Sequence, residues 1–223
     1  MIKIGYCKKY VRTSLAFSEW IIRGKIVFNG PTYFFGGTYI LVADNALLTF
    51  GGIWNMVGTD SKIICFDEIR IGKRVDITWE CQIMDTSFHY IVERNKNATP
   101  LTKKVIIGDY VWIGNRTSIT TGTIIPNHSI VASNSLVNRD LSLNGYYCLF
   151  AGIPAKVVRK NVQRVWNEKR EFEIDVKFVY HDQMGKQIEV PITLKKTELS
   201  DGNFTYYWQD KDFNIPEAVP ANL

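Results

Sequence analysis

His89 is the residue of this sequence best suited to acid–base chemistry at neutral pH. It lies in the stretch MDTSFHYIVERNKNATPLTKK (residues 84–104) and is one of three histidines in the chain. A histidine placed against a hydroxyl group can remove its proton while the oxygen attacks a carbonyl carbon. Asp85, four residues earlier, has two interpretations: its carboxylate holds one nitrogen of this base, or it forms a turn. A backbone carbonyl is a further candidate for holding the ring.

The other two histidines are weaker candidates. His128, in PNHS, falls at a predicted turn and is expected to be solvated, and His181 lies in the C-terminal part of the chain. The GxSxG motif of a serine nucleophile is absent from the sequence. For an acyl-transfer reaction, this absence favours direct attack by an acceptor hydroxyl over a covalent acyl-enzyme.

The residues around this stretch repeat with a period of six. Aliphatic residues recur at this spacing downstream and in the same phase upstream, at Ile71, Ile77, Ile83, Ile107, Ile113, Ile119, Ile125, Val131 and Val137. Small or β-branched residues form a second column four positions later, at Val75, Cys81, Val111, Thr117, Thr123, Ser129 and Ser135. This period matches neither a helix nor simple strand alternation. Three six-residue units predict a triangular coil of 18 residues, in which Ile107 stacks on Ile125, Ile113 on Val131 and Ile119 on Val137.

The period stops between Ile83 and Ile107. Aliphatic residues are expected at positions 89, 95 and 101, and the polar run ERNKNAT cannot line an apolar interior. Residues of about 88–104 are therefore predicted to leave the coil as an extended loop with His89 at its root. Long loops on a regular scaffold commonly carry function, and the alternative is an insertion with an incidental histidine.

Three segments carry a resemblance to a known family: IIGDYVWIGNRTSITTGTIIPNHSIVASNSLVNRDL, AGIPAKVVR and MDTSFHY. With them the chain resembles the hexapeptide-repeat acyltransferases over residues of about 21–160, and the last segment is similar to the subgroup that acetylates sugars in surface polysaccharide synthesis. The resemblance implies a mainly β, left-handed parallel β-helix and a homotrimer with active sites between subunits. It also implies acetyl coenzyme A as co-substrate and His89 as the general base.

The resemblance further implies where the acyl donor binds, along the flank of the helix. The matching positions are Trp112, Gly114, Asn115, Ser133, Asn138, Arg139, Lys156 and Arg159. Lysine and arginine suit the phosphates of coenzyme A as point charges or forks. The family's usual Gly-Ala-Gly is replaced here by Ala132, Ser133 and Asn134, so a tighter groove or a shifted donor is expected.

The chain is expected to contain four parts. Residues 1–20 form an N-terminal lead-in, 21–153 the β-helix domain, 154–172 a helix beginning after Pro154, and 173–223 a small β appendage. Three strands are expected in or near this appendage, in FEIDVKFVYHD, GKQIEVPITLKK and NFTYYWQD.

Composition limits the partners. The net charge of +5 is too small to argue for nucleic acid, and no apolar run or leader-like segment predicts a membrane span or export. Four scattered cysteines predict free thiols in a reducing compartment, hence a cytoplasmic protein without a metal site. The predicted function is acetyl-CoA-dependent O-acetylation of a saccharide hydroxyl. The alternatives are N-acylation of an amino sugar and a noncatalytic β-helix scaffold.

Overall fold

The computed structural model describes residues 1–6, 16–166, 171–172, 174, 193–198 and 204–209. The chain divides into two compact units, Met1–Arg164 and Val165–Leu223. The first unit carries the repeat and the candidate site. None of the helices in the described part of the chain is long and apolar enough to cross a membrane.

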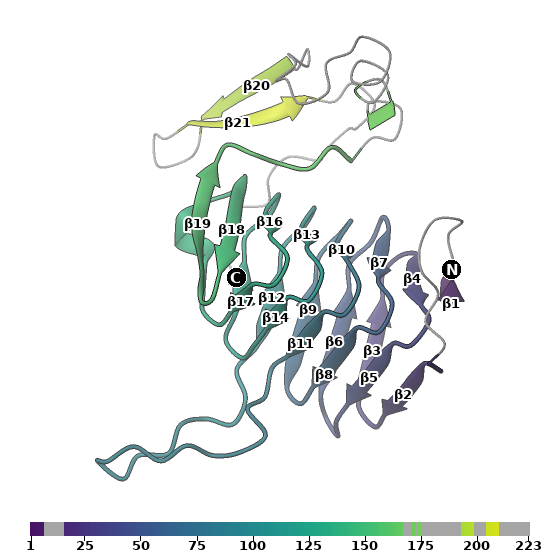
Figure 1. Ribbon diagram of the computed structural model, residues 1–223, viewed down its shortest axis with the longest axis vertical. Coiled ribbons are helices and arrows are strands. Elements are labelled where there is room, and N and C mark those ends of the chain that lie inside the picture. The colour runs from purple at the N-terminus through teal and green to yellow at the C-terminus, as the bar shows by residue number, and fades with distance from the viewer. Residues whose placement is uncertain (7–15, 167–170, 173, 175–192, 199–203, 210–223) are drawn as a thin grey trace. The chain divides into compact units, whose positions relative to one another are not determined.

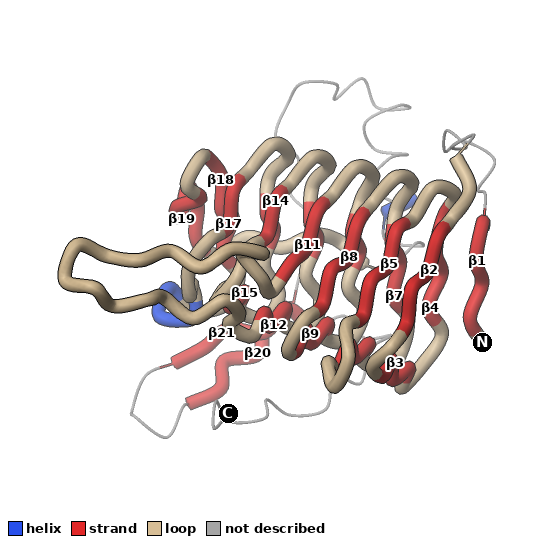
Figure 2. The backbone as a smooth tube through the Cα atoms, turned by 90° about the horizontal axis from the view of Figure 1, so that it is seen from below, coloured by secondary structure: helices blue, strands red, loops and turns tan. Residues whose placement is uncertain are grey.

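The first unit is a parallel β-solenoid with three faces, each formed by one sheet (Figures 1 and 2). Sheet A contains, in spatial order, β1 (Ile2–Tyr6), β4 (Thr32–Phe35), β7 (Asn55–Val57), β10 (Asp76–Ile77), β13 (Trp112–Ile113), β16 (Ile130–Val131), β18 (Cys148–Gly152) and β19 (Ala155–Lys160). Sheet B contains β2 (Glu19–Ile22), β5 (Tyr39–Val42), β8 (Lys62–Cys65), β11 (Gln82–Met84), β14 (Ser118–Ile119) and β17 (Leu136–Val137). Sheet C contains β3 (Lys25–Phe28), β6 (Leu47–Phe50), β9 (Glu68–Ile71), β12 (Val105–Ile107) and β15 (Ile124–Ile125), and a 3₁₀ turn, η1 (Ser142–Asn144), follows β17.

Consecutive strands visit the three sheets in turn, so each strand pairs with the strand one coil away. The predicted ladder is confirmed: Ile107 pairs with Ile125, and the pairs Ile113–Val131 and Ile119–Val137 follow. These side chains are at most 1% exposed. They fill the interior as the six-residue period predicts, and the predicted class, a left-handed parallel β-helix of mainly β structure, is confirmed.

The second column lines the inner side of the corners between sheets. Thr117, Thr123, Ser129 and Ser135 are all buried. Thr123 Oγ1 donates to the carbonyl oxygen of Val137 at 2.9 Å, and Thr117 Oγ1 donates to that of Ala132 at 3.1 Å. Small hydroxyl residues therefore recur there because they fit a tight corner and satisfy carbonyl groups of the next coil.

Two expected boundaries differ from the structure. Residues 155–160 form strand β19, antiparallel to β18, rather than the start of a helix. Ala155 is 1% exposed and Val157 packs against the core, so strand pairing and burial override the local helix propensity. At the other end, the expected lead-in contributes β1, which pairs in parallel with β4 and extends sheet A.

In the second unit, β20 (Thr193–Glu198) and β21 (Phe204–Gln209) form an antiparallel pair. They coincide with parts of the second and third expected strands. Most of the first expected strand, residues 173 and 175–182, lies outside the described residues, and residues 171–172 and 174 are helical.

Candidate active site

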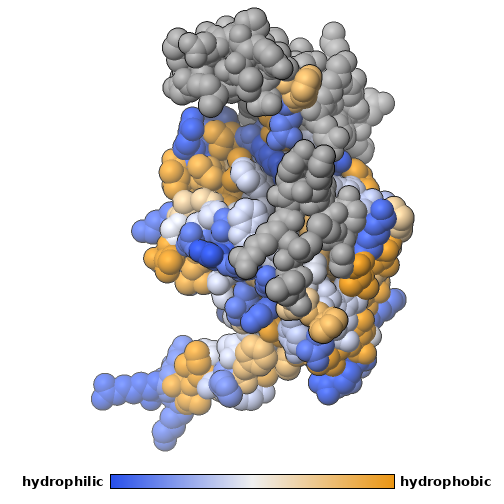
Figure 3. All heavy atoms as spheres, turned by 45° about the vertical axis from the view of Figure 1, so that its right-hand side comes forward, coloured by the Kyte–Doolittle hydropathy of each residue, from blue (hydrophilic) through white to orange (hydrophobic). Residues whose placement is uncertain are grey.

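The interruption of the repeat is a loop that projects from the solenoid between β11 and β12 (Figures 1 and 2). The loop is an irregular hairpin held by antiparallel bridges between Thr86 and Thr102 and between Val92 and Ala98. In the space-filling view, the projection has a hydrophilic tip with hydrophobic residues beside it (Figure 3). The predicted loop is thus confirmed.

His89 lies at the root of this loop with an exposed side chain. Its carbonyl oxygen accepts a hydrogen bond from Ser87 Oγ at 3.0 Å, which ties the backbone of the histidine to the loop entrance. Within the described part of the chain, no residue hydrogen-bonds to the imidazole. The ring is therefore open to a ligand from outside this chain.

Asp85 does not hold this imidazole. Its side chain is fully buried, and its two oxygens accept the backbone N–H groups of Phe66, at 2.7 Å, and of Asp67, at 2.8 Å. Burial raises the pKa of Asp85, while the two N–H donors act in the opposite direction. Of the two interpretations, the structure supports the turn-forming one, because the carboxylate holds the corner of the preceding coil.

Asn115 and Ser133 meet at the corner that joins sheet A to sheet B, here called the AB corner. Ser133 Oγ donates to Asn115 Oδ1 at 2.5 Å, and the Asn134 N–H donates to the Asn115 carbonyl at 2.9 Å. A Cβ on Gly114 would lie 2.5 Å from the nitrogen of Ser133, so only glycine allows the two coils to approach this closely. Lys156 lies beyond Ser133 along the same edge of the solenoid, because it pairs with Ala151 in the coil that follows Ser133.

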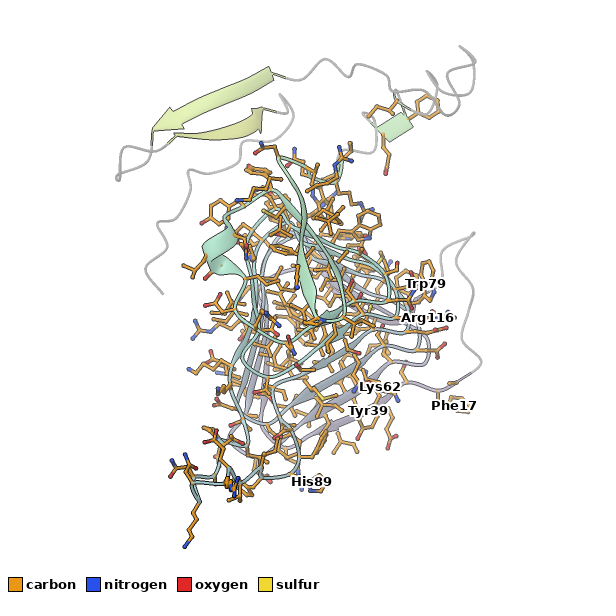
Figure 4. The ribbon with its side chains drawn as sticks, turned by 60° about the vertical axis from the view of Figure 1, so that its left-hand side comes forward. Phe17, Tyr39, Lys62, Trp79, His89 and Arg116 are labelled. Carbon is orange, nitrogen blue, oxygen red and sulfur yellow. The ribbon has the colours of Figure 1, made fainter. Side chains whose placement is uncertain are left out.

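Asn138 and Arg139 lie at a different corner. They directly follow β17 and leave sheet B at its junction with sheet C, the BC corner, which is also where the His89 loop begins. Both side chains are exposed. Figure 4 shows the separation within one chain: His89 lies at one edge and Arg116, the neighbour of Asn115, toward the other, with Tyr39 and Lys62 of sheet B between them.

Trp112 lies on the outer face of sheet A rather than at either corner. It is half-buried, and the guanidinium carbon of Arg164 lies 5.3 Å from the centre of its ring. Arg159 belongs to β19, the last strand of the same sheet, where it pairs with Leu149. The structure therefore brings Gly114, Asn115, Ser133 and Lys156 together. It places the other predicted donor residues elsewhere on the coil: Trp112, Asn138, Arg139 and Arg159.

Sequence reasoning missed an exposed aromatic residue at the AB corner. Trp79 is 46% exposed, and its carbonyl accepts the N–H of Arg116 at 3.1 Å, one coil away. Arg116 in turn forms an ion pair with Glu80 at 2.6 Å. The signal available in the sequence was the register of the repeat. Trp79 precedes Asn115 by 36 residues, which equals one coil of 18 residues plus an insertion of the same length, the loop.

His128 was expected to be solvated, and this expectation is wrong. Its ring stacks between those of Tyr110, at 5.0 Å, and Tyr147, at 4.8 Å. Burial lowers the pKa of His128 to about 4, so the ring is neutral at physiological pH. The three rings stack because Tyr110, His128 and Tyr147 occupy equivalent corner positions in successive coils, with φ of 55–58°.

Cys65, Cys81 and Cys148 are free and buried, and burial raises the pKa of Cys65 to about 12, which makes it a poor nucleophile. Cys7 lies outside the described residues. The described residues contain no group of three or more His, Cys, Asp or Glu that could hold a metal ion.

No protein-family model matches the sequence. The chain is 34% identical over 136 residues to a candidate acetyltransferase of Saccharomyces cerevisiae, which covers 60% of this chain and 62% of that protein. It is 30% identical over 140 residues to an uncharacterised protein of the cps region of Klebsiella pneumoniae, covering 63% and 60%. It is 28% identical over 130 residues to galactoside O-acetyltransferase of Escherichia coli K12, covering 58% of each. The aligned region spans about three fifths of the length of these relatives.

Among solved structures, a mutant of AntD, an N-acyltransferase from Bacillus cereus, has the same fold. The TM-score is 0.54 at 15% identity, and the match covers 81% of this chain and 91% of that chain. Together with the sequence similarity to acetyltransferases, this fold confirms the resemblance to the hexapeptide-repeat acyltransferases.

Proposed function

We propose that this protein transfers an acetyl group from acetyl coenzyme A to a saccharide hydroxyl, with His89 as the general base. The observation that carries the proposal is the exposed His89 imidazole at the root of a loop that leaves an otherwise regular solenoid. The sequence similarity to a galactoside O-acetyltransferase supports the acceptor class.

His89 supplies the proton transfers of this reaction. The imidazole takes the proton of the acceptor hydroxyl as its oxygen attacks the thioester carbonyl carbon. Collapse of the tetrahedral intermediate breaks the carbon–sulfur bond, and the imidazolium returns the proton to the departing coenzyme A thiolate. Cys65, whose thiol contacts the Asp85 carboxylate at the loop root, is buried and has a raised pKa, which favours direct attack over an acyl-enzyme.

The AB corner suits the acyl donor. Asn115 and Ser133 offer amide and hydroxyl groups at the surface, and Lys156 follows them in line with an exposed ammonium group. The pantetheine arm carries amides that such groups can hydrogen-bond, and a lysine can pair with phosphate. In this proposal Arg139 belongs to the histidine side of the site and meets the donor of a neighbouring subunit.

The two groups of residues support a site shared between subunits. His89 and Arg139 lie toward the BC corner, and Asn115 and Ser133 lie at the AB corner across sheet B of the same chain. A ligand that contacts both the His89 group and the Asn115 group can do so where the BC corner of one subunit meets the AB corner of another. We therefore include a homotrimer with active sites between subunits in the proposal, and a cytoplasmic location, which the free thiols of Cys65, Cys81 and Cys148 support.

Thiol release tests the chemistry. The protein is mixed with acetyl coenzyme A and a panel of sugars with and without amino groups, and free thiol is measured. Release with hydroxyl sugars and loss of at least about 100-fold in kcat for His89→Ala are expected, with little change in the melting temperature. Asn95→Ala, at the far end of the loop, is the matched control and keeps its turnover.

The other outcomes reject the proposal in distinguishable ways. Turnover confined to amino sugars would identify an N-acyltransferase. No turnover together with no calorimetric binding of coenzyme A would identify a scaffold. Normal turnover of His89→Ala would remove the histidine from the mechanism.

Subunit mixing tests the shared site. His89→Ala subunits are co-expressed with Ser133→Trp subunits, whose AB corner is blocked. Mixed trimers recover activity that neither variant shows alone if each site combines two chains. Absence of recovery in trimers shown to contain both variants would place the whole site within one chain.

A further inference from the structure

The backbone next to His89 is held in an uncommon conformation. Phe88 has a φ of 60°, in the left-handed region, which bulky residues adopt only when their surroundings enforce it. Its N–H donates to Thr86 Oγ1 at 3.1 Å, while Ser87 Oγ donates to the His89 carbonyl at 3.0 Å. Local hydrogen bonds on both sides of Phe88 thus enforce the direction in which the chain presents His89.

A ring contact fastens this turn to the solenoid. The rings of Phe66 and Phe88 lie 5.5 Å apart at an interplanar angle of 76°, the edge-to-face arrangement that aromatic pairs favour. Phe66 is half-buried and packs against the hydrophobic core, whereas Phe88 is 45% exposed. The half-buried ring is therefore the fixed partner, and the exposed ring is the part of the loop that it holds.

Asp85 fixes the position of Phe66. Its carboxylate accepts the N–H of Phe66 and of Asp67, and its own carbonyl accepts the N–H of Lys103 at 3.0 Å. The beginning of the loop, its end and the corner that bears Phe66 are thus joined at one buried residue. The contact from core to histidine runs through Phe66 and Phe88 without any bond to the imidazole.

We propose that Phe66 and Phe88 are positioning residues for His89, and that their ring contact sets where the imidazole meets the acceptor oxygen. This inference rests on the proposed role of His89 as the base. Misplacement of a catalytic group by about 1 Å can cost on the order of 100-fold in rate, so a contact made by the residue next to His89 has a measurable effect.

Leucine substitutions test the proposal while keeping apolar bulk at both positions. Phe66→Leu and Phe88→Leu are each expected to lower kcat by about 10- to 100-fold, with the KM for acetyl coenzyme A and the melting temperature little changed. The double variant should be no slower than the slower single variant, because both changes remove the same contact. Phe66→Tyr keeps the ring and should retain turnover.

Two controls separate positioning from general damage. Ile91→Ala alters an exposed side chain, 61% accessible, of the same loop and should keep its kcat. In a His89→Ala background, Phe66→Leu should not lower the residual rate further, because nothing remains to be positioned. Equal losses in Ile91→Ala and Phe66→Leu, or a further loss in the His89→Ala background, would overturn the proposal.

The outcomes also separate this inference from the proposed function. If His89→Ala lowers turnover and Phe66→Leu does not, the ring contact has no positioning role and the function stands. If His89→Ala retains turnover, the function itself fails.

Discussion

Arg164 forms an ion pair with Asp76, a residue 88 positions earlier in the chain. The Asp76 side chain is 3% exposed and that of Arg164 is 27% exposed. The same guanidinium lies over the Trp112 ring. A segment that follows the last strand of the solenoid thus returns across sheet A and supplies the countercharge for a buried carboxylate.

We expect Arg164→Ala to lower the free energy of unfolding by about 2–4 kcal/mol, because it leaves the Asp76 carboxylate buried and unpaired. Adding Asp76→Asn to this variant removes the unpaired charge and should restore part of the loss. Urea unfolding at a fixed protein concentration measures both effects. A double variant less stable than Arg164→Ala would contradict this account.

The stacked histidine predicts a pH-dependent stability. Burial lowers the pKa of His128 to about 4 from 6.5, so between these values the unfolded chain binds a proton that the folded chain does not. The contribution of the neutral His128 to the free energy of unfolding is fully present above pH 6.5. It is lost as the pH falls toward 4, and the total loss is about 3 kcal/mol.

The matched variant is His128→Asn, because asparagine tolerates the φ of 55° at this position. Unfolding free energies of both proteins are measured from pH 7 down to about pH 4. Wild type should lose more stability than the variant over this window. Parallel curves would show that burial does not lower the pKa of this imidazole in the folded chain.

Asp85→Asn separates a turn-forming carboxylate from an orienting one. An amide can accept only one of the two N–H groups that the carboxylate now accepts, so we expect a loss of about 1–3 kcal/mol in unfolding free energy. The midpoint of the pH dependence of kcat/KM should not move, because Asp85 has no contact with the imidazole. A shifted midpoint would return Asp85 to the role of orienting residue.

Lys156→Ala and Arg139→Ala are expected to raise the KM for acetyl coenzyme A several-fold, with kcat little changed. Both side chains are exposed, so in the proposed donor site their loss would remove phosphate contacts and little packing. Initial-rate kinetics over a range of donor concentrations measure the two constants. An unchanged KM in both variants would show that the phosphates bind elsewhere.

The repeat made most of the solenoid predictable. Ile107, Ile113 and Ile119 each point inward because a six-residue period returns them to the interior. Their partners one coil away are the residues 18 positions later in the sequence. The position of the loop followed from the same rule, because a polar run cannot occupy an apolar interior. Contacts between residues outside the repeated columns could not be predicted in this way.

Arg164 and Asp76 are separated by 88 residues, and neither position belongs to a repeated column that would connect them. The strand at 155–160 was mistaken for a helix because its pairing with β18 is decided by burial of Ala155 and Val157, which composition does not reveal. His128 was misjudged because its stacking partners lie one coil away on each side. An 18-residue comparison of ring positions would have found Tyr110 beside it.

The strands on either side of the projecting loop keep their pairing. Strand β11 remains in register with β8 and β14, and β12 with β9 and β15. The strand pairing of the solenoid therefore does not fix the length of the loop beyond the residues at its base, Asp85 and Lys103. In the proposed reaction, insertions, deletions and exchanges confined to this loop would therefore alter the surroundings of His89 and leave the strands of the scaffold and the AB corner unchanged.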